Sequence, residues 1–233
     1  MTDVAANLWR VHERIDAAAA RAGRDPAEVL LVAVSKTVEP SRIVQAYEAG
    51  MRDFGENRVQ EAEQKLTELR HTPLPGARWH LIGHLQTNKV KPAVRLFDII
   101  HSVDSLHLAQ ALARQAAAAG KTLPVLLEVN VAGEASKAGL RPDEVLSVAG
   151  EILKLPGLRV EGLMTVAPLV ADPEEVRPVF RQLRELRGRL REGLPQSNWP
   201  RLSMGMTDDF EVAVEEGATM VRIGRAVFGE RRN

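Results

Sequence analysis

Short runs of apolar, mostly β-branched residues recur along the whole chain, and longer segments with helical periodicity separate them. The first run is Leu30–Ser35, which Lys36 follows. Four to six consecutive apolar residues are typical of a strand buried on both faces of a parallel sheet. Seven further segments read as strands: Arg52–Gly55, Arg78–Gly83, Asp98–Val103, Leu123–Val131, Arg159–Val166, Arg201–Gly205 and Thr219–Gly224.

The segments between these runs carry apolar residues three and four positions apart, which predicts amphipathic helices. One helix follows a cap at Asp104 or Ser105 and stops near Gly120, because polar side chains cap helix starts and glycine favours helix ends. Pro142 suits the first turn of another helix. Further helices are expected over residues 57–70 and 173–192.

Eight strands that alternate with helices indicate an α/β protein, a (β/α)8 barrel of the TIM type, for which about 250 residues is a usual length. The alternative is an open Rossmann-like sheet, but no G-x-G-x-x-G motif follows the first strand. No linker divides the chain, so we expect one domain over residues 1–233. Residues 1–25 would add an extra helix over Asn7–Ala22, ahead of the first strand.

Composition excludes several classes of partner. Lys+Arg and Asp+Glu number 31 each, so no net basic charge attracts nucleic acid or an anionic membrane. No apolar run approaches the ~20 residues of a membrane span, and the first residues do not resemble a signal peptide. Cysteine is absent, which excludes disulfides and thiolate metal sites. These features are compatible with the cytoplasm, where we expect the protein.

Candidate chemistry is expected at the carboxyl ends of the strands, where barrels keep their sites. Lys36 ends the first strand. Partial burial lowers the pKa of a lysine and lets its amine form a Schiff base with an aldehyde or ketone. The other reading is a lysine that extends its charge from a strand end into water.

The last two strand ends resemble a phosphate site. Ser203-Met204-Gly205-Met206-Thr207 leads into a helix near Asp208, and Gly224-Arg225 begins a short helical turn. Loops after the seventh and eighth strands are the usual phosphate site of this fold. Ser203, Thr207 and the amides of Gly224 and Arg225 are the candidate donors. The other reading is that these glycines only allow tight turns.

The histidines do not predict a metal site. His80 and His84 are four residues apart, but they lie at a strand end rather than on a helix, and no carboxylate or cysteine cluster accompanies them. His101 is expected to be hydrogen-bonded near the barrel rim. A Schiff-base lysine beside a phosphate site leaves two chemistries open, a sugar-phosphate aldolase and a pyridoxal phosphate (PLP) protein.

Longer motifs resemble one family, the YggS/PROSC family of PLP-binding, PLP-homeostasis proteins. The resemblance spans essentially the whole chain. The matching segments are Val32–Thr37, Phe54–Asn57 with Gln60-Glu61, Trp79–Lys89, His101–Ser105, Gly162–Thr165, Leu202–Phe210 and Val221–Gly224.

The resemblance implies a barrel like the amino-terminal domain of alanine racemase, with PLP held by Lys36 as an internal aldimine. Arg222 would approach the pyridine nitrogen and keep it unprotonated, which weakens the electron sink needed for carbanion chemistry. The resemblance also implies that Asn57, Ser203, Thr207, Gly224 and Arg225 line the cofactor, the last four near its phosphate. Many family members have serine at position 207, and serine or threonine at position 225.

A carrier is expected rather than a racemase. Alanine racemase needs a second base, a tyrosine from a carboxyl-terminal domain of the partner subunit. We expect no such domain after Asn233, and the single tyrosine, Tyr47, lies in the first predicted helix after Lys36. We therefore expect a monomeric protein that binds PLP and delivers it to apo forms of PLP-dependent enzymes. The alternative is a PLP-dependent amino-acid racemase or another PLP enzyme of unknown substrate.

Overall fold

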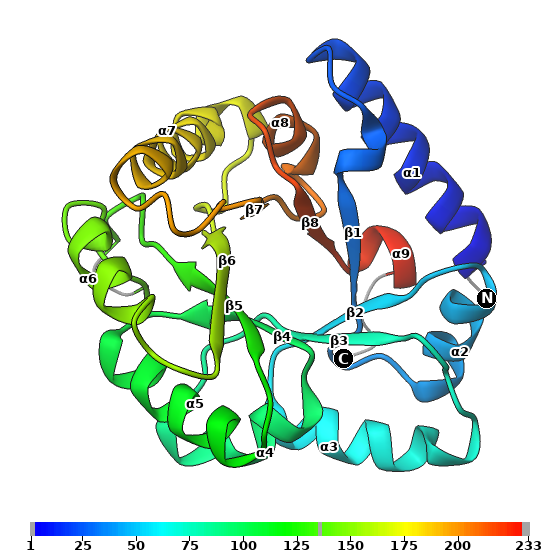
Figure 1. Cartoon of the computed structure of the whole chain (residues 1–233). Coiled ribbons are helices and arrows are strands. Elements are labelled where there is room, and N and C mark those ends of the chain that lie inside the picture. The colour runs from blue at the N-terminus through cyan, green and yellow to red at the C-terminus, as the bar shows by residue number, and fades with distance from the viewer. Residues whose placement is uncertain (1–2, 135–136, 230–233) are drawn as a thin grey trace.

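Eight parallel strands close into a barrel in the order of the sequence, β1 to β8. The structure is a computed structural model, and it describes residues 3–134 and 137–229. Each strand is followed in the chain by at least one helix (Figure 1). The strands are β1 Leu30–Val34, β2 Asp53–Glu56, β3 Arg78–Leu81, β4 Ile99–Val103, β5 Leu123–Glu128, β6 Leu158–Met164, β7 Arg201–Ser203 and β8 Met220–Ile223.

The α-helices form a ring around the strands (Figure 1). They are α1 Val4–Arg21, α2 Pro40–Glu48, α3 Val59–Glu68, α4 Val90–Leu96, α5 Leu106–Ala118, α6 Val145–Ile152, α7 Arg177–Gly193, α8 Phe210–Glu215 and α9 Arg225–Phe228. Short 3₁₀ turns are η1 Pro26–Glu28, η2 Leu69–His71, η3 Thr87–Lys89 and η4 Pro173–Val176. Most of the buried apolar side chains lie between this ring and the outer face of the barrel, in one continuous core.

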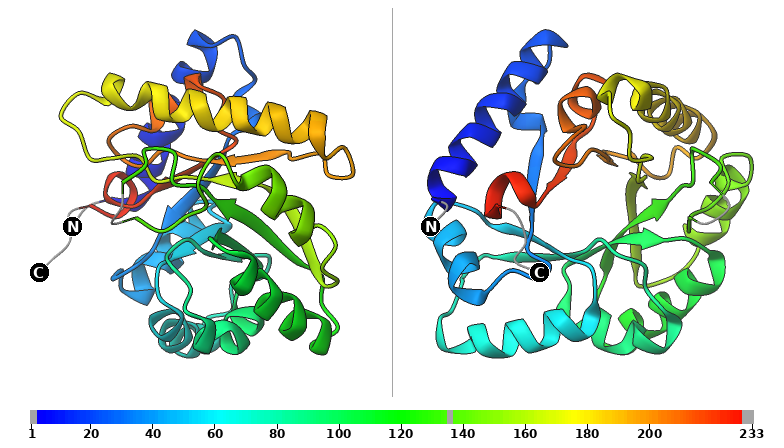
Figure 2. Two further views of the ribbon diagram at one scale, coloured as in Figure 1. Left: turned by 90° about the vertical axis from the view of Figure 1, so that its left-hand side faces the viewer. Right: turned by 180° about the vertical axis from the view of Figure 1, so that it is seen from behind.

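The extra helix α1 lies on the outside of the barrel, alongside α8 and α9 (Figure 2). Asp3 caps its first turn by accepting hydrogen bonds from the amides of Ala5 and Ala6. The Asn7 side chain donates to the carbonyl of Val227 at 3.0 Å, which ties α1 to the end of the chain. The helix predicted over residues 7–22 is therefore present and packed.

The interior of the barrel is part apolar and part polar. A small cluster inside it contains Ile99, Leu126, Met164 and Met220, all buried. Polar side chains from neighbouring strands fill the remaining space. A polar interior is costly unless its groups are hydrogen-bonded, and these groups bond to one another as described below.

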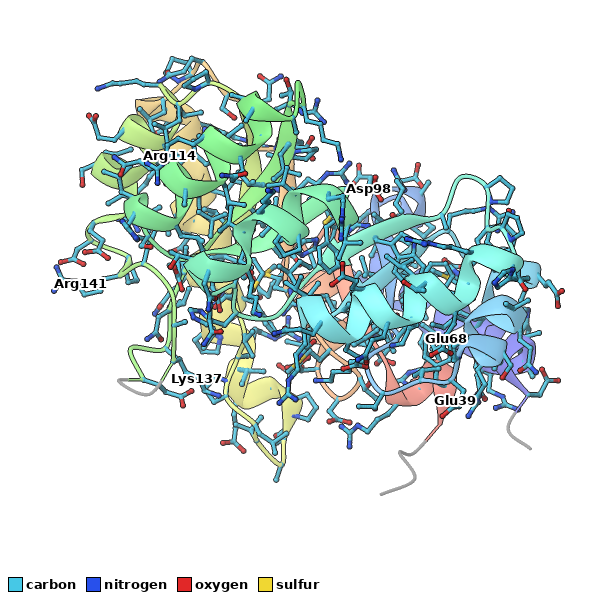
Figure 3. All side chains as sticks on the ribbon, turned by 90° about the horizontal axis from the view of Figure 1, so that it is seen from below. Glu39, Glu68, Asp98, Arg114, Lys137 and Arg141 are labelled. Carbon is cyan, nitrogen blue, oxygen red and sulfur yellow. The ribbon has the colours of Figure 1, made fainter. Side chains whose placement is uncertain are left out.

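All eight strands run in the same direction, so their carboxyl ends meet at one end of the barrel. In Figure 3 that end carries Glu39, which follows β1, and Lys137, which follows β5. Asp98, which precedes β4, lies toward the opposite end. The loops that follow the strands are therefore gathered around one opening.

The sequence prediction of a (β/α)8 barrel is confirmed, and all eight predicted strands are present. The fifth strand ends earlier than predicted, at Glu128, because the chain beyond it pairs with Leu140. Ser105 is the predicted cap of α5 and accepts from the amide of Leu108 at 3.2 Å. The prediction for Pro142 is wrong, since α6 begins only at Val145 and Pro142 lies in the preceding turn.

Within the described residues, no helix combines the length and the apolar character needed to span a bilayer.

Candidate functional site

Lys36 lies at the opening of the barrel, one residue beyond the 30–35 segment, and its side chain is partly buried. The register pairs Val34 with Gly55 of β2, so Lys36 stands level with Asn57 on one side. On the other side the register of β8 brings Gly224 next to Val34. A Cβ atom on Gly224 would lie 3.2 Å from the Val34 carbonyl oxygen, so a small residue is needed beside β1. The structure thus brings Lys36, Asn57 and Gly224 together.

The backbone on both sides of Lys36 is held by side chains of α3. Lys65 Nζ donates to the carbonyl of Ser35 at 2.7 Å. Glu61 accepts from the amide of Thr37 at 2.5 Å. Thr37 has a φ of 60°, a left-handed conformation that a β-branched residue rarely adopts. These contacts fix the backbone turn that carries Lys36 at the opening of the barrel. The strain at Thr37 is consistent with a functional site.

A buried ion pair supports this turn from behind. Lys65 Nζ lies 2.7 Å from Glu56 Oε1, and the Ser35 hydroxyl donates to the same oxygen at 2.6 Å. Burial raises the pKa of Glu56, and Lys65 and Ser35 offset part of that rise by stabilising the carboxylate. Sequence reasoning missed Lys65. The available signal was its position three residues after Ala62, on the buried face of α3.

Arg222 is the central cation of the barrel interior, with 4% of its surface exposed. Its Nη1 donates to Ser203 Oγ at 2.6 Å, and its Nη2 donates to the Thr165 carbonyl at 2.8 Å. Both acceptors are uncharged, and burial lowers the pKa of Arg222 to about 10, although Asp209 and Glu128 act in the opposite direction. The guanidinium therefore spans β8, β7 and β6 just below the opening.

Four further side chains continue from Arg222 through the barrel. Ser203 Oγ lies 2.9 Å from His101 Nδ1, and His101 Nε2 lies 2.9 Å from His80 Nδ1. His80 Nε2 lies 2.8 Å from Asp53 Oδ1. The predicted hydrogen bonding of His101 is confirmed, and its ring is fully buried between Ser203 and His80. This chain of Arg222, Ser203, His101, His80 and Asp53 is called the interior relay below.

Hydrogen-bond logic assigns the protons of the interior relay. Burial lowers the pKa of His80 and, much further, that of His101, so both rings are neutral at pH 7. Arg78 lies 2.7 Å from Asp53, and the pKa of that carboxyl is lowered because hydrogen bonds from His80 and Arg78 outweigh its burial. Each neutral ring then donates toward Asp53, and the Ser203 hydroxyl donates to His101.

Glu128 ends β5 close to Arg222 and Asp104. Burial, and to a smaller extent Asp104, raise its pKa to about 7, while Arg222 and His84 act in the opposite direction. Its Oε2 atom is buried without a hydrogen-bond partner among the described residues. A carboxyl that is half protonated near neutral pH can accept or release a proton at this opening.

The loops after β7 and β8 meet above β1. The side chain of Arg225 is paired with Asp208, so a hydrogen-bonded ion pair joins the two loops. Thr207 is partly buried in a turn, and Gly205 has a φ of 92°. A Cβ atom on Gly205 would lie 2.6 Å from the Ala213 side chain, so glycine allows close approach of α8. Ser203 is the last residue of β7, and its hydroxyl points inward to Arg222.

Asn57 borders a cavity of about 650 Å³ between the loops after β2 and β3. Its backbone packs directly against Gly83, where a Cβ atom would lie 2.4 Å from the Asn57 carbonyl oxygen. His84 also lines this cavity and pairs with Asp104 at 3.0 Å. Across the described residues no group of three or more His, Asp or Glu side chains converges as a metal site would require.

Comparison with known proteins places this geometry in a family. The alanine racemase N-terminal domain family matches residues 7–232. A pyridoxal phosphate homeostasis protein of Pseudomonas aeruginosa is 47% identical over 231 residues, which are 99% of this chain and 97% of the relative. The chain belongs to the family of pyridoxal phosphate homeostasis proteins. A second family member, from Aquifex aeolicus, is 47% identical over 225 residues, covering 97% of each chain.

The family includes a solved structure with PLP. PipY of Synechococcus elongatus, solved with PLP bound, is 41% identical and superposes with a TM-score of 0.82. The match covers 94% of this chain and all of that one. The predicted family and the predicted barrel are therefore both confirmed.

Proposed function

We propose that this protein binds PLP at the barrel opening and serves PLP homeostasis, with Lys36 as the covalent anchor. Lys36 Nζ condenses with the cofactor aldehyde, and water leaves, which forms a Schiff base. PLP supplies an aldehyde for amines and an electron-withdrawing ring. The observation that carries the proposal is that Lys36 lies at the rim after β1, while Arg222 lies buried on the neighbouring strand β8, level with Val32.

The donor set of Arg222 fits the cofactor ring. Arginine has five N–H donors, and Ser203 and Thr165 take two of them. The remaining donors have no acceptor among the described residues, so they are available to an uncharged ring nitrogen at the opening. Because arginine does not give up its proton, it would hold that nitrogen unprotonated. A ring kept in this state favours storage of the aldehyde over carbanion chemistry.

The phosphate would bind to the loops after β7 and β8. Thr207 offers a hydroxyl, and Gly224 and Arg225 offer backbone amides beside β1. The Arg225 side chain is engaged with Asp208, so we assign the amide rather than the guanidinium to the phosphate. Ser203 would act on the cofactor through Arg222, and Asn57 would border it from the β2 side.

We further propose that the protein works as a monomer in the cytoplasm and passes PLP to apo forms of PLP-dependent enzymes. Lys36 is only partly buried at the opening, which supports approach of an acceptor to its side chain. Balanced charge, with 31 basic and 31 acidic residues, supports exchange with varied protein partners rather than nucleic acid.

The experiment is an absorption spectrum of protein incubated with PLP, before and after borohydride reduction. We expect a Schiff-base band, and after reduction a tryptic peptide containing Lys36 with the added mass of pyridoxyl phosphate. Lys36→Ala should lose both signals. Lys89→Ala, at the border of the adjacent cavity, should keep both. A band and an adduct that survive in Lys36→Ala would refute the anchor, and transfer to an apo-enzyme would then separate delivery from storage.

A further inference from the structure

A second, larger cavity lies away from Lys36, at the amino-terminal end of the barrel. Its volume is about 820 Å³, within the range of ~300–1,000 Å³ that small-molecule sites occupy. Its walls come from α7, from the starts of β6 and β7, and from the loop of residues 196–200. Because the strands are parallel, this end is opposite to the opening that carries Lys36.

The charged lining of this cavity is mainly basic. Two glutamates, Glu28 and Glu161, face five arginines, which are Arg24, Arg159, Arg187, Arg191 and Arg201. The lining therefore carries three positive charges in excess, although the whole chain is neutral. Because basic and acidic residues are equal in number in the whole chain, this excess of positive charge is a local feature of the cavity.

Four of the five guanidiniums are held in place by the protein. Arg159 and Arg201 both pair with Glu161, at 2.7 and 2.9 Å. Arg24 donates to the Val214 carbonyl at 2.6 Å. Arg191 donates to the carbonyls of Asn198 and Trp199, at 3.1 and 3.3 Å, and so fixes the loop of residues 196–200. These contacts preorganise the basic wall before any ligand arrives.

Arg187 differs from the other four. Its guanidinium has no hydrogen bond and no ion pair with any residue in the part of the chain that the structure describes, yet the side chain is partly buried. Burial, together with the neighbouring charges of Arg191 and Arg24, lowers its pKa to about 10. An unpaired cation among like charges is unfavourable for folding alone, whereas an anion in the cavity would relieve it.

We propose that this cavity is a binding site for a small, multiply charged phosphorylated anion, with Arg187 as its central ligand. The planar guanidinium matches two oxygens of one phosphate, and several arginines together suit more than one phosphate group. Three excess positive charges match an anion that carries two to four negative charges. Polar side chains of Gln196 and Asn198 at the same wall would contact the uncharged part of such a ligand.

The test uses inorganic pyrophosphate as the probe and isothermal titration calorimetry on protein loaded with PLP. Loading keeps the probe out of the phosphate position near Lys36, and the absorption spectrum reports any displaced PLP. We expect saturable binding of one equivalent, weakened at least tenfold in Arg187→Gln. Arg189→Gln is the matched control, because Arg189 is exposed on the same helix outside the cavity, and it should bind like the parent.

Three outcomes would overturn the proposal. One is the absence of saturable heat with the parent protein at low ionic strength. Another is equal weakening in Arg187→Gln and Arg189→Gln, which would indicate attraction by the overall field of α7 rather than a site. Displacement of PLP in step with the heat would place the probe at Lys36 and would equally refute the second site. If the protein does not bind PLP, the comparison of Arg187→Gln with Arg189→Gln on unloaded protein still tests this cavity, so the test stands apart from the test of the proposed function.

Discussion

Arg222 Nη1 donates a hydrogen bond of 2.6 Å to Ser203 Oγ, inside the barrel just below its opening and between the neighbouring strands β8 and β7. The Ser203 oxygen accepts from a charged donor while its own proton goes to His101. Both functions of the hydroxyl are thus used by the protein itself. The orientation of the guanidinium therefore depends on Ser203, and through it on His101, His80 and Asp53.

Removal of the Ser203 hydroxyl should destabilise the fold. Ser203→Ala leaves one buried guanidinium donor and His101 Nδ1 without partners, and hydrogen bonds to charged groups contribute about 1.5–3 kcal/mol each. We expect a loss of about 2–3 kcal/mol in the free energy of unfolding, measured with urea. Ser102→Ala is the control, since its hydroxyl makes one neutral bond, to the Gly83 carbonyl at 2.7 Å. A cost no larger than that of the control would contradict the interior relay.

Ionisation of Glu128 should make the protein less stable as the pH rises. Its pKa is raised to about 7, so between pH ~4.5 and 7 the folded state binds more protons than the unfolded state. Stability from the neutral carboxyl is complete below the unfolded pKa and is lost as the pH passes about 7. Glu128→Gln should remove this slope and exceed the parent at pH 8 by up to ~3 kcal/mol. Parallel pH profiles of parent and variant would contradict the assignment.

The two buried histidines should change the stability in the opposite direction, so that it falls as the pH falls. Burial lowers both of their pKa values, so below pH ~6.5 the unfolded chain takes up protons that the folded protein does not. Stability should fall as the pH falls, by up to about 1.4 kcal/mol per unit for each ring. The measurement is best made in the Glu128→Gln background, by urea unfolding from pH 8 to 5. In that background, His101→Gln should reduce the slope of the free energy of unfolding against pH. An unchanged slope would mean that the His101 ring is protonated in the folded state.

The ion pair behind Lys36 should be strongly coupled. Lys65→Met leaves the buried Glu56 carboxylate with only the Ser35 hydroxyl, and breaking a buried pair from one side costs about 3–5 kcal/mol. The double variant Lys65→Met/Glu56→Gln should recover part of this loss, because the side chain is then neutral and still accepts from Ser35. A double-mutant cycle in urea measures the coupling. Additive effects would show that the two side chains do not support each other.

Gly83 should tolerate no side chain. In Gly83→Ala the new Cβ would lie 2.4 Å from the Asn57 carbonyl oxygen and 2.8 Å from its Cα, both backbone atoms that cannot move independently. We expect a loss of about 1–3 kcal/mol and weaker PLP binding in a spectroscopic titration. Gly188→Ala is the control, because that glycine is in α7 with open space around it, and it should gain about 0.5–1 kcal/mol. Equal stability of Gly83→Ala and the parent would exclude the close contact.

Local patterning was enough to predict the barrel and its rim. Each strand is a short apolar run and each helix an apolar stripe, and both periods depend only on the geometry of the local backbone. Lys36, Thr207 and Gly224 were predicted in this way, because the ends of parallel strands meet at one opening whatever the details of packing. Asn57 was predicted from the family resemblance. The predicted boundaries at Val131 and Pro142 were wrong, since they depend on the pairing of Val129 with Leu140 and on the course of the loop that follows.

Only the tertiary structure decided which polar groups meet. Asp53, His80, His101, Ser203 and Arg222 lie on five different strands, and each looks like an ordinary polar residue in its own segment. Closure of the barrel places them in one buried chain of hydrogen bonds. In the same way, the basic cavity at the other end brings together arginines as far apart in the sequence as Arg24 and Arg201. Sequence alone determines which residues face inward. The distances among inward residues follow from the closure and stagger of the whole sheet, which no single segment encodes.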